Sequence, residues 1–203
     1  MIVIIEGHRH SGKTFLIEKF LEQNINPNVH YYKFQFAKYV DELGMRDQET
    51  GPGVHYFSIA NVLTILELNQ TLLKDHILIF DRCIFSAYVW SIYRERMGTF
   101  RLVEEFRRIL ISDLYQNSKV LYVERAEDIE VTKREKDYFG NFENADHERE
   151  LFERIFSEFK PEITDSLRNN DFDRMVNHFN EESIVEFNST VNGLINSDIL
   201  LNK

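Results

Sequence analysis

The first 23 residues constrain the fold most, because they read as a strand, a glycine-bounded loop and a helix in direct succession. Ile2 to Ile5 ("IVII") is a continuous β-branched run, typical of a strand buried on both faces. The loop "GHRHSGKT" follows at Gly7 to Thr14, and four residues separate its two glycines. Lys13 to Gln23 then predicts a helix. Strand, loop and helix in this order, with Gly-Lys-Thr at the junction, predict a phosphate-binding loop.

Backbone N–H groups in such a loop converge on phosphate oxygens, aided by the positive end of the following helix. Lys13 would reach the β- and γ-phosphates, and Thr14 would offer its hydroxyl to Mg²⁺. The residues expected to bind phosphate are Gly7, His8, Arg9, His10, Ser11, Gly12, Lys13 and Thr14. The loop is unusual because residues 8–10, a His-Arg-His sequence, carry bulky side chains.

Short apolar runs alternate with longer amphipathic stretches along the rest of the chain, which predicts an α/β fold with right-handed crossovers. We expect further strands at 29–36, 76–81, 119–123 and 183–188. We expect further helices at 55–74, 86–97, 101–116, 147–163 and 190–201. The inner side of the first helix is expected to carry Phe15, Leu16, Ile17, Phe20 and Leu21. The pattern therefore predicts a five-stranded parallel sheet covered on both faces, with the polar tract 169–182 left unassigned.

Length and composition fit a single domain over residues 1–203, since 43% of the residues are hydrophobic and 13% aromatic. The net charge of −10 argues against a nucleic-acid partner or an anionic membrane surface, because both require a lysine and arginine footprint. One cysteine excludes an internal disulfide, and no run of apolar residues is long enough for a membrane span. A cytoplasmic location is the expectation, with a small-molecule nucleotide as substrate.

A second motif is "LIFDRCIFSAYVW", in which Asp81 ends the predicted third strand. Ligands of open parallel sheets bind beyond the carboxyl ends of strands, so this carboxylate can hold Mg²⁺ or its water together with Thr14. The guanidinium of Arg82 can fork onto a second phosphate. The alternative is an ordinary surface ion pair between the two residues.

A third group is cationic and follows the predicted fourth strand: Lys133, Arg134 and Lys136. These side chains predict a lid, roughly residues 130–144, that closes over the transferring phosphoryl group and neutralises its charge. A solvated helix face paired with Glu130 and Glu135 is the alternative.

"IVIIEGHRHSGKT", "LIFDRCIFSAYVW" and the charged segment after "VLYVERAED", in this order, resemble thymidylate kinase and its close P-loop relatives. The resemblance implies a three-layer P-loop kinase fold with a short lid. It also implies transfer of the γ-phosphoryl group of ATP, with Mg²⁺, to a deoxynucleoside monophosphate such as dTMP. Lys13, Asp81, Arg82 and Arg134 would be the catalytic residues. A homodimer packed through helices beside the third strand is implied as well.

The resemblance places Arg82 on the acceptor phosphate and Phe57, in "YFSIAN", on the acceptor base, although plain core packing would also explain Phe57. The sequence departs from the family on the acceptor side. Arg9 stands where the family carries an acidic residue against the acceptor sugar, and Asn61 replaces the arginine that reads the pyrimidine edge. An amide both donates and accepts hydrogen bonds, so a related or modified base is compatible with Asn61.

Two other functions stay open. A deoxynucleoside kinase shares the fold, but it needs a carboxylate base at the end of the second strand, where Asp41 and Glu42 are the nearest candidates. A nucleotide-binding module with a degenerate acceptor site would explain the missing acceptor residues. The absence of a guanine-reading Asn-Lys-x-Asp motif argues against a GTPase.

Overall fold

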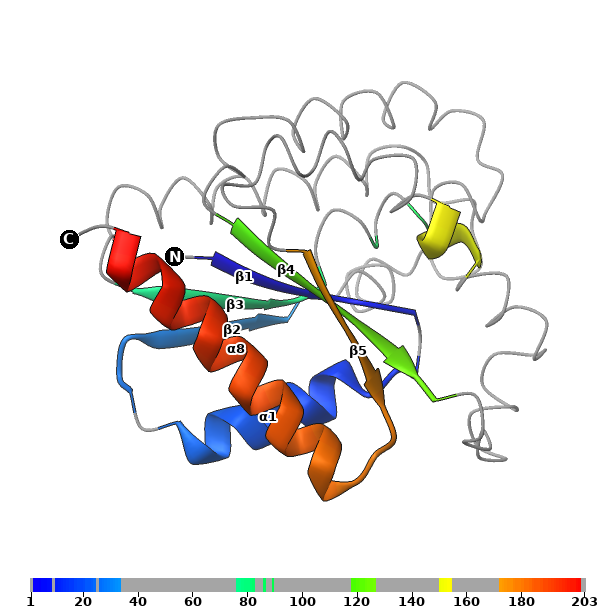
Figure 1. Ribbon diagram of the computed structural model, residues 1–203, viewed down its shortest axis with the longest axis horizontal. Helices are drawn as coiled ribbons and strands as arrows, with labels where there is room; N and C mark the ends of the chain where they lie inside the picture. The colour runs from blue at the N-terminus through cyan, green and yellow to red at the C-terminus, as the bar shows by residue number, and fades with distance from the viewer. Residues whose placement is uncertain are drawn as a thin grey trace, which may run out of the picture.

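The chain folds around a parallel sheet of five strands (Figure 1). In a computed structural model, the described residues are 2–8, 10–24, 26–33, 76–82, 86, 89, 118–126, 150–154 and 172–201. The strands are β1 (Ile2–Glu6), β2 (Val29–Lys33), β3 (Ile77–Asp81), β4 (Ser118–Arg125) and β5 (Phe172–Asn177). The helices are α1 (Lys13–Gln23) and α8 (Glu181–Leu201). Residues 150–154 are helical as well.

The strand order is β2-β3-β1-β4-β5, so β1 lies at the centre of the sheet. All four neighbouring pairs are parallel. The register sets Ile5 against Asp81 of β3 and against Leu121 of β4. The carboxyl ends of β1 and β3 therefore meet at one edge, where the loop after β1 and Asp81 come together.

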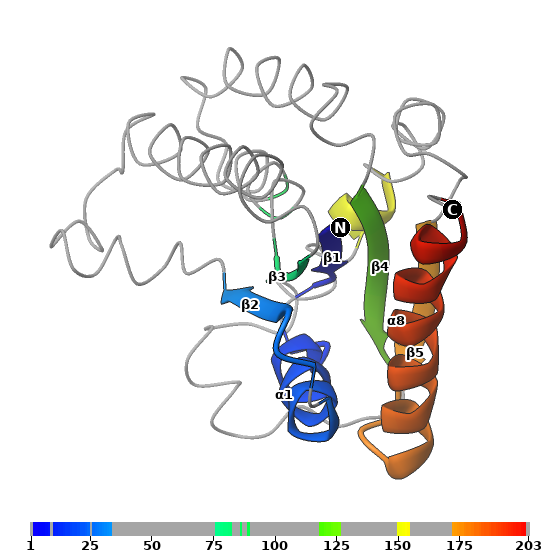
Figure 2. The ribbon, with the colours of Figure 1, turned by 90° about the vertical axis from the view of Figure 1, so that its left-hand side faces the viewer.

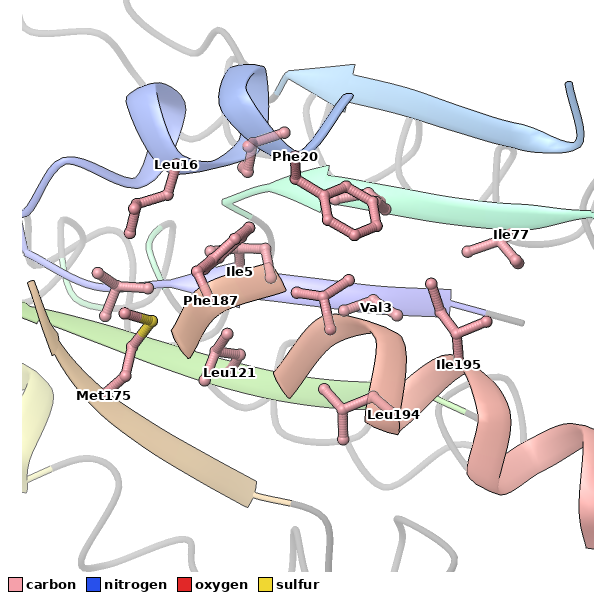
Figure 3. Packing of buried hydrophobic residues seen from close by; sticks show 14 residues of the cluster. Val3, Ile5, Leu16, Phe20, Ile77, Leu121, Met175, Phe187, Leu194 and Ile195 are labelled. Atoms are coloured by element: carbon pink, nitrogen blue, oxygen red, sulfur yellow. The ribbon is translucent and has the colours of Figure 1, made fainter. Parts of the chain in front are cut away.

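Helices α1 and α8 cover the same face of the sheet (Figures 1 and 2). Strand side chains alternate between faces, and in β1 it is Val3 and Ile5 that point toward the two helices. The buried cluster beneath them joins β1, β3, β4 and β5 to both helices, and Val29 and Tyr31 of β2 pack against it. Figure 3 shows how the side chains of the cluster interlock. Phe20 of α1 and Phe187 of α8 meet edge to face, with ring centroids 6.3 Å apart. This packing fixes α1, and so the loop before it, on the sheet.

The expected five-stranded parallel sheet is confirmed, but the predicted fifth strand at 183–188 was wrong. These residues form the first half of α8, and the fifth strand is β5, inside the tract that was left unassigned. Buried residues of α8 follow a helical period, namely Ser183, Phe187, Val191, Leu194 and Ile195. The side chain of Asn180 caps the helix by accepting the N–H of Ser183 at 2.9 Å. The adjacent β-branched residues Ile184 and Val185, followed by Phe187, are typical of a strand and explain the wrong prediction.

The first helix matches its predicted bounds, Lys13–Gln23, but one of its inner residues was misplaced. Leu16, Ile17 and Phe20 are buried, whereas Phe15 is 37% exposed. On the opposite face of the sheet, Tyr122 packs on Phe152 of the 150–154 helical turn, with ring centroids 5.6 Å apart. Among the described residues, no helix is long and apolar enough to span a membrane.

Candidate phosphate and acceptor site

The loop between β1 and α1 is closed by its own lysine. Lys13 is 4% exposed, and its Nζ donates to the carbonyl oxygens of Gly7 (2.9 Å) and His8 (2.7 Å) and to Ser11 Oγ (3.0 Å). An ammonium group has three N–H donors, so these three bonds use all of them. The positive charge therefore lies inside the curve of the loop, where the sequence predicted that it would meet phosphate.

Both predicted loop glycines are required by their surroundings. Gly7 has φ 148° and Gly12 has φ 83°, conformations that favour glycine. A Cβ on Gly7 would collide with the carbonyl oxygen of Val123, and one on Gly12 would collide with the side chains of Asn177 and Phe179. The loop thus lies directly against the ends of β4 and β5.

Two side chains tie the loop to these strand ends. His8 is buried, and its Nε2 accepts the backbone N–H of Arg125 at 3.1 Å, so the proton of its ring lies on Nδ1. Asn177 is fully buried, donating from Nδ2 to the carbonyl of Ser11 (2.9 Å) while its Oδ1 accepts the N–H of Phe179 (2.8 Å). The imidazole of His8 therefore anchors the loop, and the phosphate contact that the sequence predicted for His8 stays a prediction.

Asp81 joins the end of β3 to the start of α1. Its Oδ2 accepts the hydroxyl of Thr14 at 2.5 Å and the hydroxyl of Tyr31 at 3.1 Å. Thr14 and Asp81 are 67 positions apart in the chain, and the sequence had assigned both to Mg²⁺. No hydrogen bond from a described residue reaches the other carboxylate oxygen, Oδ1. The structure therefore brings the two predicted metal-site residues into contact.

Tyr31, on β2, was not singled out from the sequence. Burial raises the pKa of its hydroxyl well above the ordinary value, and the nearby negative charge of Asp81 raises the pKa further. The hydroxyl therefore stays protonated and donates to Asp81 at every ordinary pH. Tyr31 from β2 and Thr14 from α1 therefore both donate to the same carboxylate oxygen of Asp81.

A second carboxylate, Glu6 at the end of β1, lies on the opposite face of the sheet from Asp81. It is fully buried and accepts two hydrogen bonds from Ser86, at 2.6 Å from Oγ and 3.3 Å from the backbone N–H. Ser86 Oγ in turn accepts a hydrogen bond from Nη1 of Arg82 at 3.0 Å. Arg82 is half-buried and has φ 70°, in the left-handed region. Its backbone N–H donates to the carbonyl of Ile5 at 2.9 Å.

An aromatic pair flanks the loop on its outer side. The rings of Phe15 and Phe179 are stacked with centroids 6.5 Å apart and an interplanar angle of 29°. They are 37% and 42% exposed, which is unusual for two large apolar side chains in contact. Phe179 also has φ 56° and is held in that conformation by Asn177. The pair offers an apolar surface directly beside Gly12.

Several predicted site residues lie outside the described part of the chain. These are Arg9, Phe57, Asn61, Lys133, Arg134 and Lys136, together with the alternative base candidates Asp41 and Glu42 and the lid at 130–144. His10, which is described, is half-buried and has φ 60°. In the described ranges, no group of three or more His, Cys, Asp or Glu residues could hold a metal ion. The described site therefore contains the loop, Asp81 and Arg82.

Three solved structures are similar in fold to nearly the whole of this chain. NadR in complex with NR has a TM-score of 0.66 at 14% identity; the match covers 95% of this chain but only 49% of the NadR chain. Thymidylate kinase from Candida albicans has a TM-score of 0.60 at 14% identity, covering 97% of this chain and 91% of that one. Thymidylate kinase from Ehrlichia chaffeensis has a TM-score of 0.55 at 17% identity, covering 96% and 98%.

The chain has a P-loop kinase fold. Identities of 14–17% establish the fold and leave substrate and activity to be argued from the residues. No family model matches the sequence, and no curated protein matches it either. The match to this chain covers about half the length of the NadR chain and nearly the whole length of the two thymidylate kinases.

Proposed function

We propose that the chain transfers the γ-phosphoryl group of ATP to a deoxynucleoside monophosphate, with dTMP or a related pyrimidine nucleotide as acceptor. The observation that carries this proposal is the hydrogen bond between Thr14 and Asp81. It unites the end of the phosphate-binding loop with the Asp-Arg motif of β3, two motifs that the sequence pointed to independently. A nucleotide kinase must bind the donor phosphates and a metal ion at one place. The phosphate-binding loop and the Thr14–Asp81 pair would form that place.

The oxygen atoms of Thr14 and Asp81 fit Mg²⁺. Hydroxyl and carboxylate oxygens are hard ligands, and Mg²⁺ commonly takes one or two protein oxygens while phosphates and waters complete its shell. Mg²⁺ held by Thr14 and Asp81 would supply positive charge to neutralise the donor phosphates. Lys13 would exchange some of its bonds to loop carbonyls for bonds to the β- and γ-phosphates. The exposed faces of Phe15 and Phe179 would give the base of ATP an apolar surface.

Arg82 is proposed to bind the phosphate of the acceptor. It lies at the same sheet edge as the loop, next to Asp81, and the residue is only half-buried. A monophosphate acceptor is already an anion, so positioning and charge neutralisation are sufficient and no catalytic base is required. The proposed roles of Arg9, Phe57 and Asn61 in acceptor binding, and of Lys133, Arg134 and Lys136 in the lid, rest on the sequence.

A nucleoside acceptor is the second candidate, because NadR in complex with NR gives the highest TM-score among the three structures compared. A nucleoside kinase must remove a proton from a hydroxyl, which calls for a carboxylate at the end of the second strand. The described part of β2 ends at Lys33, which is exposed and pairs in register with Asp81, and the first carboxylates that follow it in the sequence are Asp41 and Glu42. Because no carboxylate base lies at this strand end in the sequence, a monophosphate acceptor is favoured over a nucleoside acceptor.

The test is ATP consumption with Mg²⁺ over a panel of deoxynucleoside monophosphates and free nucleosides, with the products separated by chromatography. We expect turnover on dTMP or another pyrimidine monophosphate, with a diphosphate as product. Turnover on nucleosides alone would replace the proposal with the second candidate. ATP binding without transfer to any acceptor would favour the nucleotide-binding module.

A further inference from the structure

We propose that Glu6 and Ser86 are positioning residues that aim Arg82 at the acceptor phosphate. The inference deepens the proposed function and rests on it for the identity of the acceptor. Neither Glu6 nor Ser86 would touch the substrate. Each would act through the guanidinium of Arg82, and the effect of losing either would fall on acceptor use.

The three residues form a chain of hydrogen bonds with a defined direction. Ser86 Oγ donates its only proton to Oε2 of Glu6 at 2.6 Å, so its lone pairs are left to accept Nη1–H of Arg82 at 3.0 Å. The carboxylate also accepts the backbone N–H of Ser86 at 3.3 Å. Two donors from one residue hold the carboxylate, and the hydroxyl proton therefore points away from Arg82.

Burial makes this arrangement specific. Glu6 and Ser86 are both fully buried, and a buried carboxylate is stabilised only where donors or a positive charge face it. Bonds to an ionised group are shorter and stronger than neutral ones, as the 2.6 Å contact illustrates. The guanidinium is consequently held through its Nη1 by the hydroxyl of Ser86.

The backbone of Arg82 indicates why such support is needed. A φ of 70° places a non-glycine residue in the left-handed region, which costs about 1 kcal/mol or more. The bond from its N–H to Ile5 and the bond from its side chain to Ser86 compensate this cost at both ends of the residue. Without Ser86 the guanidinium would lose the hydrogen bond that holds Nη1 at the sheet edge.

The location of Glu6 separates this network from the metal site. In β1 the side chains of Val3 and Ile5 point toward α1 and α8, so the side chain of Glu6 lies on the opposite face of the sheet. In β3 the side chain of Asp81 lies on the same face as Ile77 and Ile79, which is the α1 side. The network is therefore expected to affect the acceptor and to leave MgATP unaffected. A role that was only structural would affect both substrates equally.

The experiment measures steady-state KM for dTMP and for MgATP in Ser86→Ala and Glu6→Gln. Ser86→Ala should raise the KM for dTMP about tenfold and change the KM for MgATP by less than about twofold, with kcat little altered. Glu6→Gln should do the same, because glutamine has one acceptor atom where the carboxylate receives two donors. Ser86→Thr keeps the hydroxyl and should restore the KM for dTMP.

Ser183→Ala is the matched control, since Ser183 is a buried serine whose Oγ accepts the N–H of His178 far from Arg82. It should lower thermal stability without separating the two KM values. Equal rises in both KM values in Ser86→Ala, or failure of Ser86→Thr to restore the KM for dTMP, would overturn the positioning role.

NMR of the arginine side chains distinguishes failure of this inference from failure of the proposed function. The signal from Nη1 of Arg82, assigned by its loss in Arg82→Lys, should exchange slowly in the wild-type protein and rapidly in Ser86→Ala. That result without turnover on any monophosphate would support the network and reject the proposed acceptor. An unchanged signal in Ser86→Ala would reject the network, whichever acceptor is used.

Discussion

Two carboxylates end neighbouring strands of the sheet and serve opposite faces of it. Asp81 ends β3 on the α1 side, where Oδ2 receives hydroxyl groups from Thr14 and Tyr31. Glu6 ends β1 on the other side, where both oxygens receive donors from Ser86. Among the described residues, both donors to Asp81 reach the same oxygen, whereas each of the two oxygens of Glu6 accepts a hydrogen bond.

The difference shows how one sheet edge can separate two tasks. A carboxylate with an oxygen to spare can bind a ligand, while a carboxylate saturated by internal donors can only orient its neighbours. On this view the α1 side handles the donor phosphates, and the opposite side handles the acceptor. The following predictions test that division, from the largest expected effect to the smallest.

Lys13→Met should reduce phosphoryl transfer about a thousandfold, because the only ammonium group inside the described loop would be lost. It should also lower the melting temperature, since the carbonyls of Gly7 and His8 would each lose the hydrogen bond from Nζ of Lys13. Coupled-assay turnover and thermal unfolding measure the two effects. Lys19→Met is the control: Lys19 lies on the same helix, is 38% exposed and pairs with Glu22, and its loss should alter neither property. Normal turnover in Lys13→Met would remove the basis for the donor side.

Asp81→Asn should lower kcat/KM for MgATP about a hundredfold while changing the KM for dTMP little. The amide keeps the size of the side chain but removes the charge that Mg²⁺ requires. A titration of Mg²⁺ at fixed ATP should show a higher requirement for the metal. Glu6→Gln should show the reverse selectivity, and the same kinetic defect in both variants would abolish the distinction between the two faces.

Phe179→Ala should raise the KM for ATP about three- to tenfold, the loss expected for one aromatic contact, and leave kcat nearly unchanged. Its ring is 42% exposed, so stability should change little. Val185→Ala provides the matched control, because Val185 is 67% exposed on α8. An unchanged KM for ATP in Phe179→Ala would mean that the base of ATP does not lie on this pair.

Tyr31→Phe should lower the free energy of unfolding by about 1 kcal/mol through loss of the bond to Asp81. The pKa of Tyr31 is raised in the folded protein, so the unfolded chain releases this proton first, at about pH 10. In the wild type, the contribution of Tyr31 is therefore complete below that pH and declines as pH rises above it. Denaturant unfolding between about pH 9 and 11 should show this decline in the wild type, and it should be weaker in Tyr31→Phe. Equal slopes would contradict the assignment.

Local sequence signals predicted the position of the loop between β1 and α1, and α1 itself, well. A β-branched run, two glycines and a helical period all occur within the first 23 residues, and the helix has its predicted bounds. The pairing of Thr14 with Asp81 could be anticipated because parallel strands end at a common edge. The start of α8 could also have been found, since Asn180 followed by Glu181 and Glu182 is a helix-start signal.

Other parts of the site depend on contacts between distant segments and carry no local signal. Asn177 holds Ser11 across 166 positions, which no period or spacing reveals. β5 is an edge strand that alternates exposed Arg174 and Val176 with buried Met175, so its composition resembles a loop. Tyr31 looked like one more aromatic residue of a strand, and its role depends on the register that places it near Asp81.

The most direct measurement is calorimetric titration of a non-hydrolysable ATP analogue with Mg²⁺ into the wild-type protein and into Lys13→Met, without any acceptor. One analogue should bind per wild-type chain, and Lys13→Met should bind it at least about tenfold more weakly. Equal affinity in the two proteins, or no binding to the wild type, would contradict the assignment of the β1–α1 loop to nucleotide phosphates.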